Sequence, residues 1–258
     1  MIDMRSIGFI ILAGIILGVI TGCLTGKKAV SSPQVFIASS GLELPYQIYF
    51  PKSDVKNKLP LFIWLHGMGE RGNDNINQLK HVVPFVISDS VQRKFPCIVA
   101  APQCPDDDYW ASLNSKDWEK GRQADATRPM KAVMEWIAEL AKDPRVDPSR
   151  IYVGGLSMGG YGTLDLISRK PEWFAAAIPV CGGIDVSRAT TFKNVPLWIF
   201  HGAKDPVVPV KLSRDLVKAL EQAGAKPIYT EYPEGGHDVW NAAIREKGLM
   251  EWMFSQTL

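Results

Sequence analysis

The sequence predicts an α/β domain over residues 35–258, with a mostly parallel central sheet and helices on both of its faces. Strand-like and helix-like segments alternate along this region, which is typical of parallel sheets joined by crossover helices. The later strands are almost wholly apolar, as expected for strands that are covered on both faces. Glycine-rich loops at residues 66–72 and 154–160 follow two of these strands, at the carboxyl edge of the sheet where α/β proteins place their sites.

The individual elements follow from local patterns. Residues 35–38 and 46–50 are rich in β-branched and aromatic side chains and are predicted to form an opening hairpin. The apolar residues 60–65 and 97–101 are the next predicted strands, and residues 129–142 show the i, i+3, i+4, i+7 spacing of an amphipathic helix. The remaining elements are predicted, in chain order, as strand 151–153, helix 161–168, strand 174–180, strand 196–200, helix 210–223, strand 227–232 and helix 240–254. Because the insertions between strands are short, no large cap domain is expected.

The N-terminal segment differs from the rest of the chain. It holds an uncharged apolar run of about 14 residues, which suits a signal peptide better than a membrane span of ~20 residues. Residues 20–23, Ile-Thr-Gly-Cys, resemble the lipobox of bacterial lipoprotein signal peptides. The resemblance implies that residues 1–22 are removed, that Cys23 is lipidated, and that residues 23–34 tether the protein to a membrane in the cell envelope, outside the cytoplasm. The alternative is an uncleaved anchor helix over residues 6–26.

Composition excludes several classes of function. The 258-residue chain has 29 basic and 27 acidic residues, scattered rather than striped, so no nucleic-acid partner is expected. It has no C-x-x-C pair and no His/Cys cluster with zinc-ligand spacing, so neither a metal nor a cofactor is expected. With Cys23 lipidated, Cys97 and Cys104 either form a loop disulfide or remain buried free thiols, and Cys181 is left over.

The segment 151–162 carries the clearest chemical signal. Gly155-Leu-Ser157-Met-Gly159 fits the G-x-S-x-G pattern of a nucleophile elbow, placed between a strand and a helix. In such a turn a strained backbone lifts the serine hydroxyl clear of the sheet, and the next amide, that of Met158, faces a developing oxyanion. Ser157 is therefore predicted to be a nucleophile.

A serine hydroxyl needs a base, and the base needs an orienting acid. His237 is the predicted base, because it follows the last strand in a glycine-containing loop that can reach back to the serine. His66 and His201 each precede a glycine after an apolar strand and are expected to brace loops, whereas His81 is expected to be a surface residue.

The orienting acid should lie between the serine and the histidine in the chain, which is the order that proteins with this elbow use. Asp205 fits best, because it lies in a loop directly after an apolar strand. Less suitable carboxylates are those of Asp165, Asp185, Asp215 and Asp238.

The oxyanion needs a second amide. The loop after Leu65, His66-Gly-Met-Gly, resembles the HG-x motif of lipases and esterases and is the expected source. The amide of Met68 is predicted to supply the donor, with that of Gly67 as the alternative.

Together these motifs resemble those of α/β-hydrolase esterases, in particular the bacterial secreted group often labelled predicted peptidase or phospholipase/carboxylesterase-like. The motifs are Leu65-His-Gly-Met-Gly-Glu-Arg-Gly72, Ala101-Pro-Gln-Cys-Pro105 with Trp110, Gly155-Leu-Ser-Met-Gly-Gly-Tyr-Gly162, Gly202-Ala-Lys-Asp-Pro-Val-Val-Pro209 and Gly236-His-Asp-Val-Trp240. The resemblance implies a serine esterase with the triad Ser157, Asp205 and His237.

Substrate signals are weaker. In the loop 106–123, Tyr109, Trp110 and Trp118 either wall an acyl or aryl pocket or pack the loop onto the body, and Gly67 and Trp240 are further candidates for the pocket. An open site without a cap would admit acetyl or feruloyl esters on polysaccharide as well as small esters.

The competing hypotheses are a serine peptidase on the same fold, a non-catalytic surface lipoprotein that binds glycan, and a dienelactone-hydrolase-like enzyme, which typically has cysteine where this elbow has serine.

Overall fold

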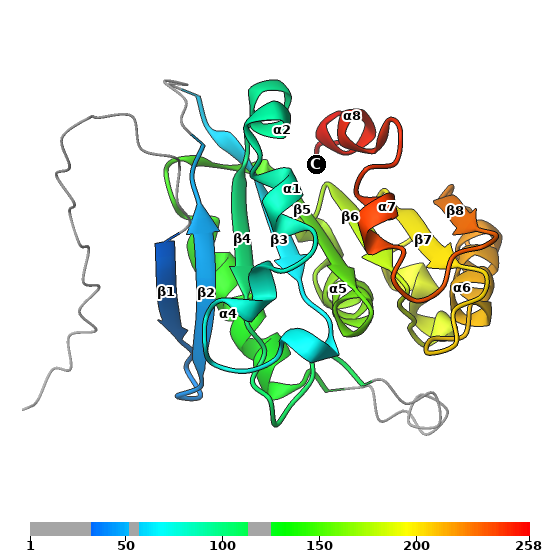
Figure 1. Cartoon of the computed structure of the whole chain (residues 1–258), viewed down its shortest axis with the longest axis horizontal. Helices are drawn as coiled ribbons and strands as arrows, with labels where there is room; N and C mark the ends of the chain where they lie inside the picture. Colours follow the sequence, from blue (N-terminus) through cyan, green and yellow to red (C-terminus); the bar gives the residue numbers. More distant parts are fainter. Residues whose placement is uncertain (1–31, 52–56, 113–124) are drawn as a thin grey trace, which may run out of the picture.

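The computed structural model describes residues 32–51, 57–112 and 125–258 (Figure 1). The predicted signal peptide, its Cys23 and most of the loop 106–123, including Trp118, lie outside these residues. None of the helices within the described ranges combines the length and the apolar character that crossing a membrane requires.

A single eight-stranded sheet in the order β1-β2-β4-β3-β5-β6-β7-β8 forms the centre of the domain. β2 runs antiparallel to both of its neighbours, β1 and β4, and β3 to β8 are mutually parallel, which confirms the predicted fold class. The strands are β1 (Ser32–Ile37), β2 (Glu43–Tyr49), β3 (Leu59–Leu65), β4 (Ile98–Pro102), β5 (Val146–Leu156), β6 (Ala176–Val180), β7 (Trp198–Gly202) and β8 (Ile228–Tyr232).

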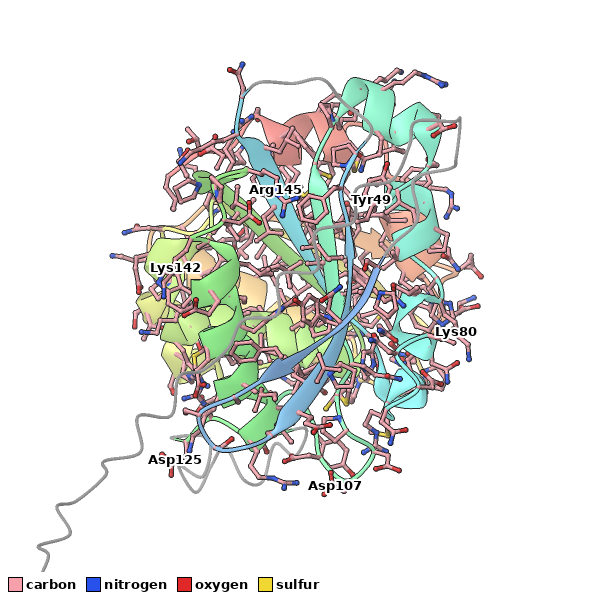
Figure 2. The ribbon with its side chains drawn as sticks, turned by 90° about the vertical axis from the view of Figure 1, so that its left-hand side faces the viewer. Tyr49, Lys80, Asp107, Asp125, Lys142 and Arg145 are labelled. Atoms are coloured by element: carbon pink, nitrogen blue, oxygen red, sulfur yellow. The ribbon has the colours of Figure 1, made fainter. Side chains whose placement is uncertain are left out.

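Helices cover both faces of this sheet. In Figure 2 the sheet is seen along its edge, with Lys142 at the end of α4 on one side and Lys80, ahead of α1, on the other. The α-helices are α1 (Val83–Val86), α2 (Asp89–Lys94), α4 (Arg128–Leu140), α5 (Met158–Arg169), α6 (Lys211–Gln222), α7 (Trp240–Ala243) and α8 (Leu249–Phe254). Short 3₁₀ turns are η1 (Met68–Glu70), η2 (Asn77–Leu79), η3 (Pro171–Trp173) and η4 (Val186–Thr191).

The central strand β3 shows why its sequence is apolar throughout. Leu61, Ile63 and Leu65 point into a core shared with α4, α5 and α6, whereas Phe62 and Trp64 point into a second core shared with α1, α2, α7 and α8. Side chains alternate between the faces of a strand. A strand covered on both faces must therefore be apolar at every position.

The C-terminal segment differs from the prediction. One helix was expected over residues 240–254, but the structure has two, α7 and α8, separated by a break at Gly248. Gly248 has φ 86°, a left-handed conformation that glycine adopts at little cost and that ends helical continuity. Because apolar residues on both sides of the break enter the same core, their spacing conceals the break in the sequence.

The structure also distinguishes between the two alternatives for Cys97 and Cys104. Cys97, Cys104 and Cys181 are all buried and free, so of the two alternatives for Cys97 and Cys104 the buried free thiols are correct. Burial raises the pKa of both the Cys97 and the Cys181 thiol to about 12, so both stay protonated at neutral pH.

Glycines let α5 lie unusually close to the sheet. A methyl group added at Gly159 would lie 2.0 Å from the carbonyl oxygen of Leu65, at the end of β3. One added at Gly155 would lie 2.3 Å from the carbonyl oxygen of Gly159, and one at Gly162 would lie 2.6 Å from Cβ of Trp110. These approaches are shorter than any contact between non-bonded heavy atoms, so the elbow motif is also a packing requirement.

We expect Gly159→Ala to destabilise the fold by about 1–3 kcal/mol or more, because the added methyl group would have to push α5 away from β3. The matched control is Gly69→Ala, since a methyl group at Gly69 meets nothing within 4 Å. Urea unfolding followed by circular dichroism measures both variants. Equal unfolding midpoints for the two would contradict this account of the elbow.

Candidate active site

Ser157 lies at the turn between β5 and α5, in the conformation that the elbow motif predicts. Its backbone angles are φ 52° and ψ −118°, a region that costs a non-glycine residue ~1–3 kcal/mol. Two hydrogen bonds hold it there, because the Ser157 amide donates to the carbonyl of Val180 at 2.9 Å and the Ser157 carbonyl accepts from Tyr161 at 3.1 Å. The strain is thus held by the strand and helix on either side.

His237 reaches Ser157 from the loop between β8 and α7. Its Nε2 lies 2.8 Å from Oγ of Ser157, and its Nδ1 lies 2.7 Å from Oδ2 of Asp205. Because an ionised carboxylate only accepts hydrogen bonds, Nδ1 carries the proton and Nε2 accepts from the serine hydroxyl. The three predicted residues therefore form one ordered chain of hydrogen bonds.

Asp205 lies in the turn after β7, and its side chain has no exposed surface. The amides of Val207 and Val208 both donate to Oδ1 at 2.8 Å, while Oδ2 accepts from His237. Burial alone would raise the pKa of Asp205, but the hydrogen bonds from His237, Val208 and Val207 outweigh it and lower the pKa below its ordinary value. The carboxylate is therefore ionised at neutral pH.

His201 supports the turn that carries Asp205. Its Nε2 lies 3.0 Å from the carbonyl of Val208 and 3.3 Å from Oδ2 of Asp205, and its Nδ1 lies 2.7 Å from Oγ of Ser213. Burial lowers the pKa of His201, so the ring is neutral and donates through Nε2 while accepting from Ser213. His201 braces a loop, as predicted.

Cys181, His201 and Asp205 come within 4.8 Å of one another and are the residues of the described chain that could hold a metal ion. Asp205 already accepts three hydrogen bonds in this position. An ion there would compete with His237 for the carboxylate, so the cluster serves the hydrogen-bond chain better than it would serve a metal.

The loop after β3 carries the amide of Met68, the predicted second donor to the oxyanion. His66 is buried, and burial lowers its pKa to about 4, so its ring is neutral at neutral pH. Its Nε2 accepts from the Cys104 amide at 2.9 Å, so its Nδ1 donates to the Gly67 carbonyl at 2.6 Å. That carbonyl and the Met68 N–H belong to one planar peptide and point in opposite directions, so His66 fixes the direction of the Met68 N–H.

The backbone N–H groups of Met68 and Met158 are both without a hydrogen-bond acceptor in the described protein. Both N–H groups are therefore available to a ligand, as the predicted oxyanion hole requires.

The predicted pocket aromatics are placed differently from one another. Trp110 is fully buried, and its indole N–H donates to the His66 carbonyl at 3.1 Å, so it packs beneath the loop and does not wall a pocket. Tyr109 is 40% exposed and stacks with the Arg71 guanidinium. Trp240 stands edge-on to His237, with ring centres 5.6 Å apart. Trp118 lies outside the described residues.

His81, expected to be a surface residue, is partly exposed but also has packing partners. Its side chain is only 30% exposed, lies 3.4 Å from Glu70 and packs at 5.3 Å against the ring of Trp240. Sequence reasoning missed both His81 and Glu70 as neighbours of the site. The presence of Glu70 in the glycine-rich loop was the only available signal.

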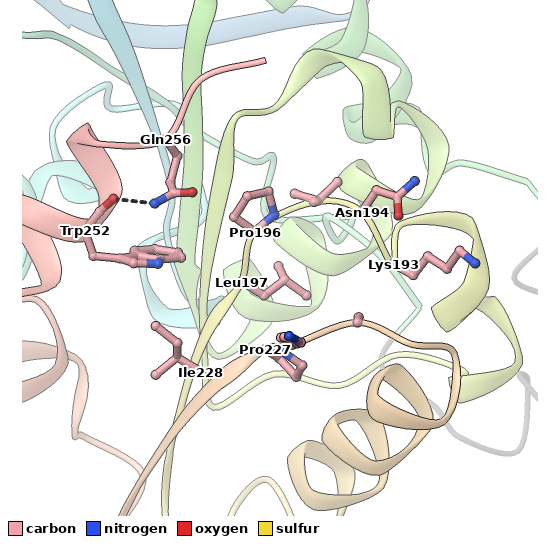
Figure 3. A pocket seen from close by; sticks show the side chains of 11 residues that line it. Lys193, Asn194, Pro196, Leu197, Pro227, Ile228, Trp252 and Gln256 are labelled. Carbon is pink, nitrogen blue, oxygen red and sulfur yellow. Dashed lines mark hydrogen bonds between the residues drawn. The ribbon is translucent and has the colours of Figure 1, made fainter.

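A cavity of about 260 Å³ lies elsewhere, between the C-terminal helix and the starts of β7 and β8 (Figure 3). Pro196, Leu197 and Pro227, which line it, precede these strands, and Trp252 and Gln256 close one side. The cavity therefore opens at the amino edge of the sheet, opposite the edge that carries Ser157.

The sheet order, the elbow and the hydrogen-bond chain define an α/β-hydrolase. Residues 50–247 match the family described as Phospholipase/Carboxylesterase, and the chain belongs to this family. It is similar to a protein of Arabidopsis thaliana named "Probable carboxylesterase SOBER1-like", with 23% identity over 210 residues, 74% of this chain and 76% of that protein. A bifunctional acetylxylan esterase/xylanase of Neocallimastix patriciarum is 31% identical over 115 residues, 42% of this chain and 16% of that protein.

The crystal structure of a thermostable esterase matches with a TM-score of 0.80 and 39% identity over 88% of this chain. The chain spans 63% of that esterase, less than two thirds of its length. The family and these relatives identify the chain as a hydrolase of the esterase type.

The role of His66 as a positioning residue can be tested with two variants. His66→Ala removes the donor to the Gly67 carbonyl and should lower kcat for p-nitrophenyl butyrate by about 10–100-fold, less than the 10²–10³ typical of deleting an oxyanion donor outright. His66→Asn places an amide N–H near the position of Nδ1 and should restore part of the loss. If Asn and Ala are equally impaired, His66 acts only through the stability of the loop.

Proposed function

We propose that this protein is a serine carboxylesterase that works through an acyl-enzyme. The observation that carries the proposal is the continuous hydrogen-bond chain from Asp205 through His237 to Ser157. In this arrangement Ser157 is the nucleophile and His237 the general base, while Asp205 fixes the imidazole tautomer and stabilises the imidazolium.

The reaction proceeds in two halves. As Ser157 Oγ attacks the ester carbonyl, its proton passes to Nε2 of His237, and the carbonyl oxygen becomes an oxyanion that accepts from the Met68 and Met158 amides. His237 then gives the proton to the leaving alcohol, and the acyl group stays on Ser157. Water then attacks the carbonyl of the acyl-enzyme while His237 takes its proton. As the bond to Ser157 Oγ breaks and the acid leaves, His237 returns the proton to Oγ.

For the natural substrate we propose acyl or feruloyl esters carried on polysaccharide, in addition to small esters. The proposal is supported by the similarity to a protein whose name includes acetylxylan esterase. Activity on small soluble esters with none on acetyl- or feruloyl-polysaccharide would count against this part of the proposal.

We further propose that the protein is held on a membrane, outside the cytoplasm, by a lipid on Cys23. The support is the lipobox-like Ile20-Thr-Gly-Cys23 at the end of an apolar run.

Ser157→Ala should reduce hydrolysis of p-nitrophenyl acetate and butyrate by on the order of a million-fold, because the nucleophile is lost. Ser90→Ala is the matched control, since Ser90 is an exposed serine on α2 whose hydroxyl lies 3.1 Å from that of Ser88. The full chain is assayed for release of p-nitrophenolate, with circular dichroism to verify folding. A folded Ser157→Ala variant that keeps more than a few per cent of the activity would contradict the mechanism.

Cys23→Ser should abolish incorporation of labelled fatty acid when the full chain is expressed in a bacterium that processes lipoproteins, and should leave residues 1–22 attached. Mass spectrometry of the N-terminal peptide reports both effects. The membrane proposal fails if the wild-type chain carries no label and retains residues 1–22.

A further inference from the structure

Three side chains form a wall beside the proposed active site. Trp240 stands between two histidines, with its ring 5.6 Å from that of His237 and 5.3 Å from that of His81. His81 in turn lies 3.4 Å from Oε1 of Glu70. The Glu70–His81–Trp240 wall therefore runs from the loop of Met68 round to the proposed base.

Glu70 lies against the loop of the proposed oxyanion hole. A methyl group built on Gly67 would come within 3.0 Å of Oε2 of Glu70, so the carboxyl group is in contact range of the Gly67–Met68 peptide. The backbone of Glu70 is held firmly, because its carbonyl accepts from the Gln103 side chain at 3.1 Å. The position of the carboxyl group is thus built into the loop.

Among the described residues, the carboxyl group of Glu70 has a single and distant partner, His81. Glu70 is 9% exposed, and its one side-chain hydrogen bond in the described structure is the long one to His81. Oε2 has no protein donor there and is not sealed from solvent. A carboxyl oxygen that has no protein donor and still reaches solvent is available to a donor on a ligand.

The other members of the wall indicate what kind of ligand fits. The indole N–H of Trp240 is a donor that meets no protein acceptor in the described ranges and is not sealed from solvent. The wall therefore offers an acceptor, Oε2 of Glu70, and a donor, the Trp240 indole N–H, beside an aromatic face, while Nε2 of His81 faces Oε1 of Glu70. Hydroxyl groups both donate and accept, whereas an ammonium only donates and would leave the indole N–H unpaired.

The position of the wall indicates which part of the substrate it meets. Because His237 must pass its proton to the leaving oxygen, the leaving alcohol lies within hydrogen-bond reach of Nε2. The ring of Trp240 lies edge-on to the ring of His237 at 5.6 Å, so the wall adjoins the residue that must reach this alcohol. We infer that the Glu70–His81–Trp240 wall is a subsite for a polyhydroxylated alcohol, so that the enzyme acts on acylated sugars; this inference rests on the proposed esterase function.

The test compares three acetates whose leaving alcohols differ: a methyl β-D-xylopyranoside monoacetate, cyclohexyl acetate, which has a six-membered ring without further hydroxyls, and acetylcholine, which has a cation. The wild-type enzyme should prefer the sugar acetate to cyclohexyl acetate in kcat/KM by about tenfold or more, as expected for a hydrogen bond to a charged group. Glu70→Gln should reduce this ratio about tenfold, and Trp240→Phe should reduce it several-fold. The matched control is Glu221→Gln, on the exposed side of α6, which should keep the wild-type ratio.

The ratio is measured within each variant, so partial loss of folded enzyme does not affect it. A ratio that stays within about twofold of wild type in Glu70→Gln overturns the inference, as does a preference for acetylcholine that Glu70→Gln removes. If Glu70→Gln does not fold, inhibition of the wild type decides: methyl β-D-xylopyranoside should inhibit at lower concentration than cyclohexanol, and equal inhibition overturns the inference. Failure of the proposed function is distinguishable, because a wild-type chain that hydrolyses neither p-nitrophenyl acetate nor any of the three acetates is no esterase at all.

Discussion

The structure of the site depends on one strained residue. Ser157 occupies φ 52° and ψ −118° because β5 must pass into α5 within a single residue, and this turn closes only if α5 lies almost in contact with the end of β3. The glycines around Ser157 make the approach sterically feasible, and the hydrogen bonds to Val180 and Tyr161 hold the result. Strain of ~1–3 kcal/mol at one residue is small against the apolar burial on both faces of the sheet. The surrounding cores therefore keep the serine hydroxyl raised toward the loops.

The remaining parts of the site reach Ser157 by the same principle of close backbone approach. A methyl group on Gly202, at the end of β7, would lie 2.1 Å from the carbonyl of Gly236, so the loop of Asp205 and the loop of His237 touch through glycine backbones. Neutral, buried histidines then fix the loops: His201 holds the turn of Asp205, and His66 holds the peptide of Met68. All four histidines of the chain thus lie in or directly beside the site, and His66 and His201 are held there as neutral rings.

Sequence reasoning reached the fold and the hydrogen-bonded residues because both depend on local patterns. Apolar strands and glycine-rich loops mark the sheet and its carboxyl edge, and chain order selects Asp205 and His237. Features that depend on tertiary packing were out of reach. Trp110 packs where Gly162 has no side chain, and His81 packs against Trp240. The break at Gly248 is concealed by apolar spacing that continues across it. No local pattern in the sequence encodes these contacts.

The central claim is that Ser157 is a nucleophile activated by its hydrogen bond to His237. The most direct measurement is reaction of the full chain with a fluorophosphonate, followed by mass spectrometry of the peptides. The account predicts one phosphonyl group per chain, on Ser157, formed rapidly in the wild type and far more slowly in a His237→Ala variant, because an unactivated serine hydroxyl is a weak nucleophile. A chain that remains unlabelled, or that is labelled at another residue at the same rate with and without His237, would contradict it.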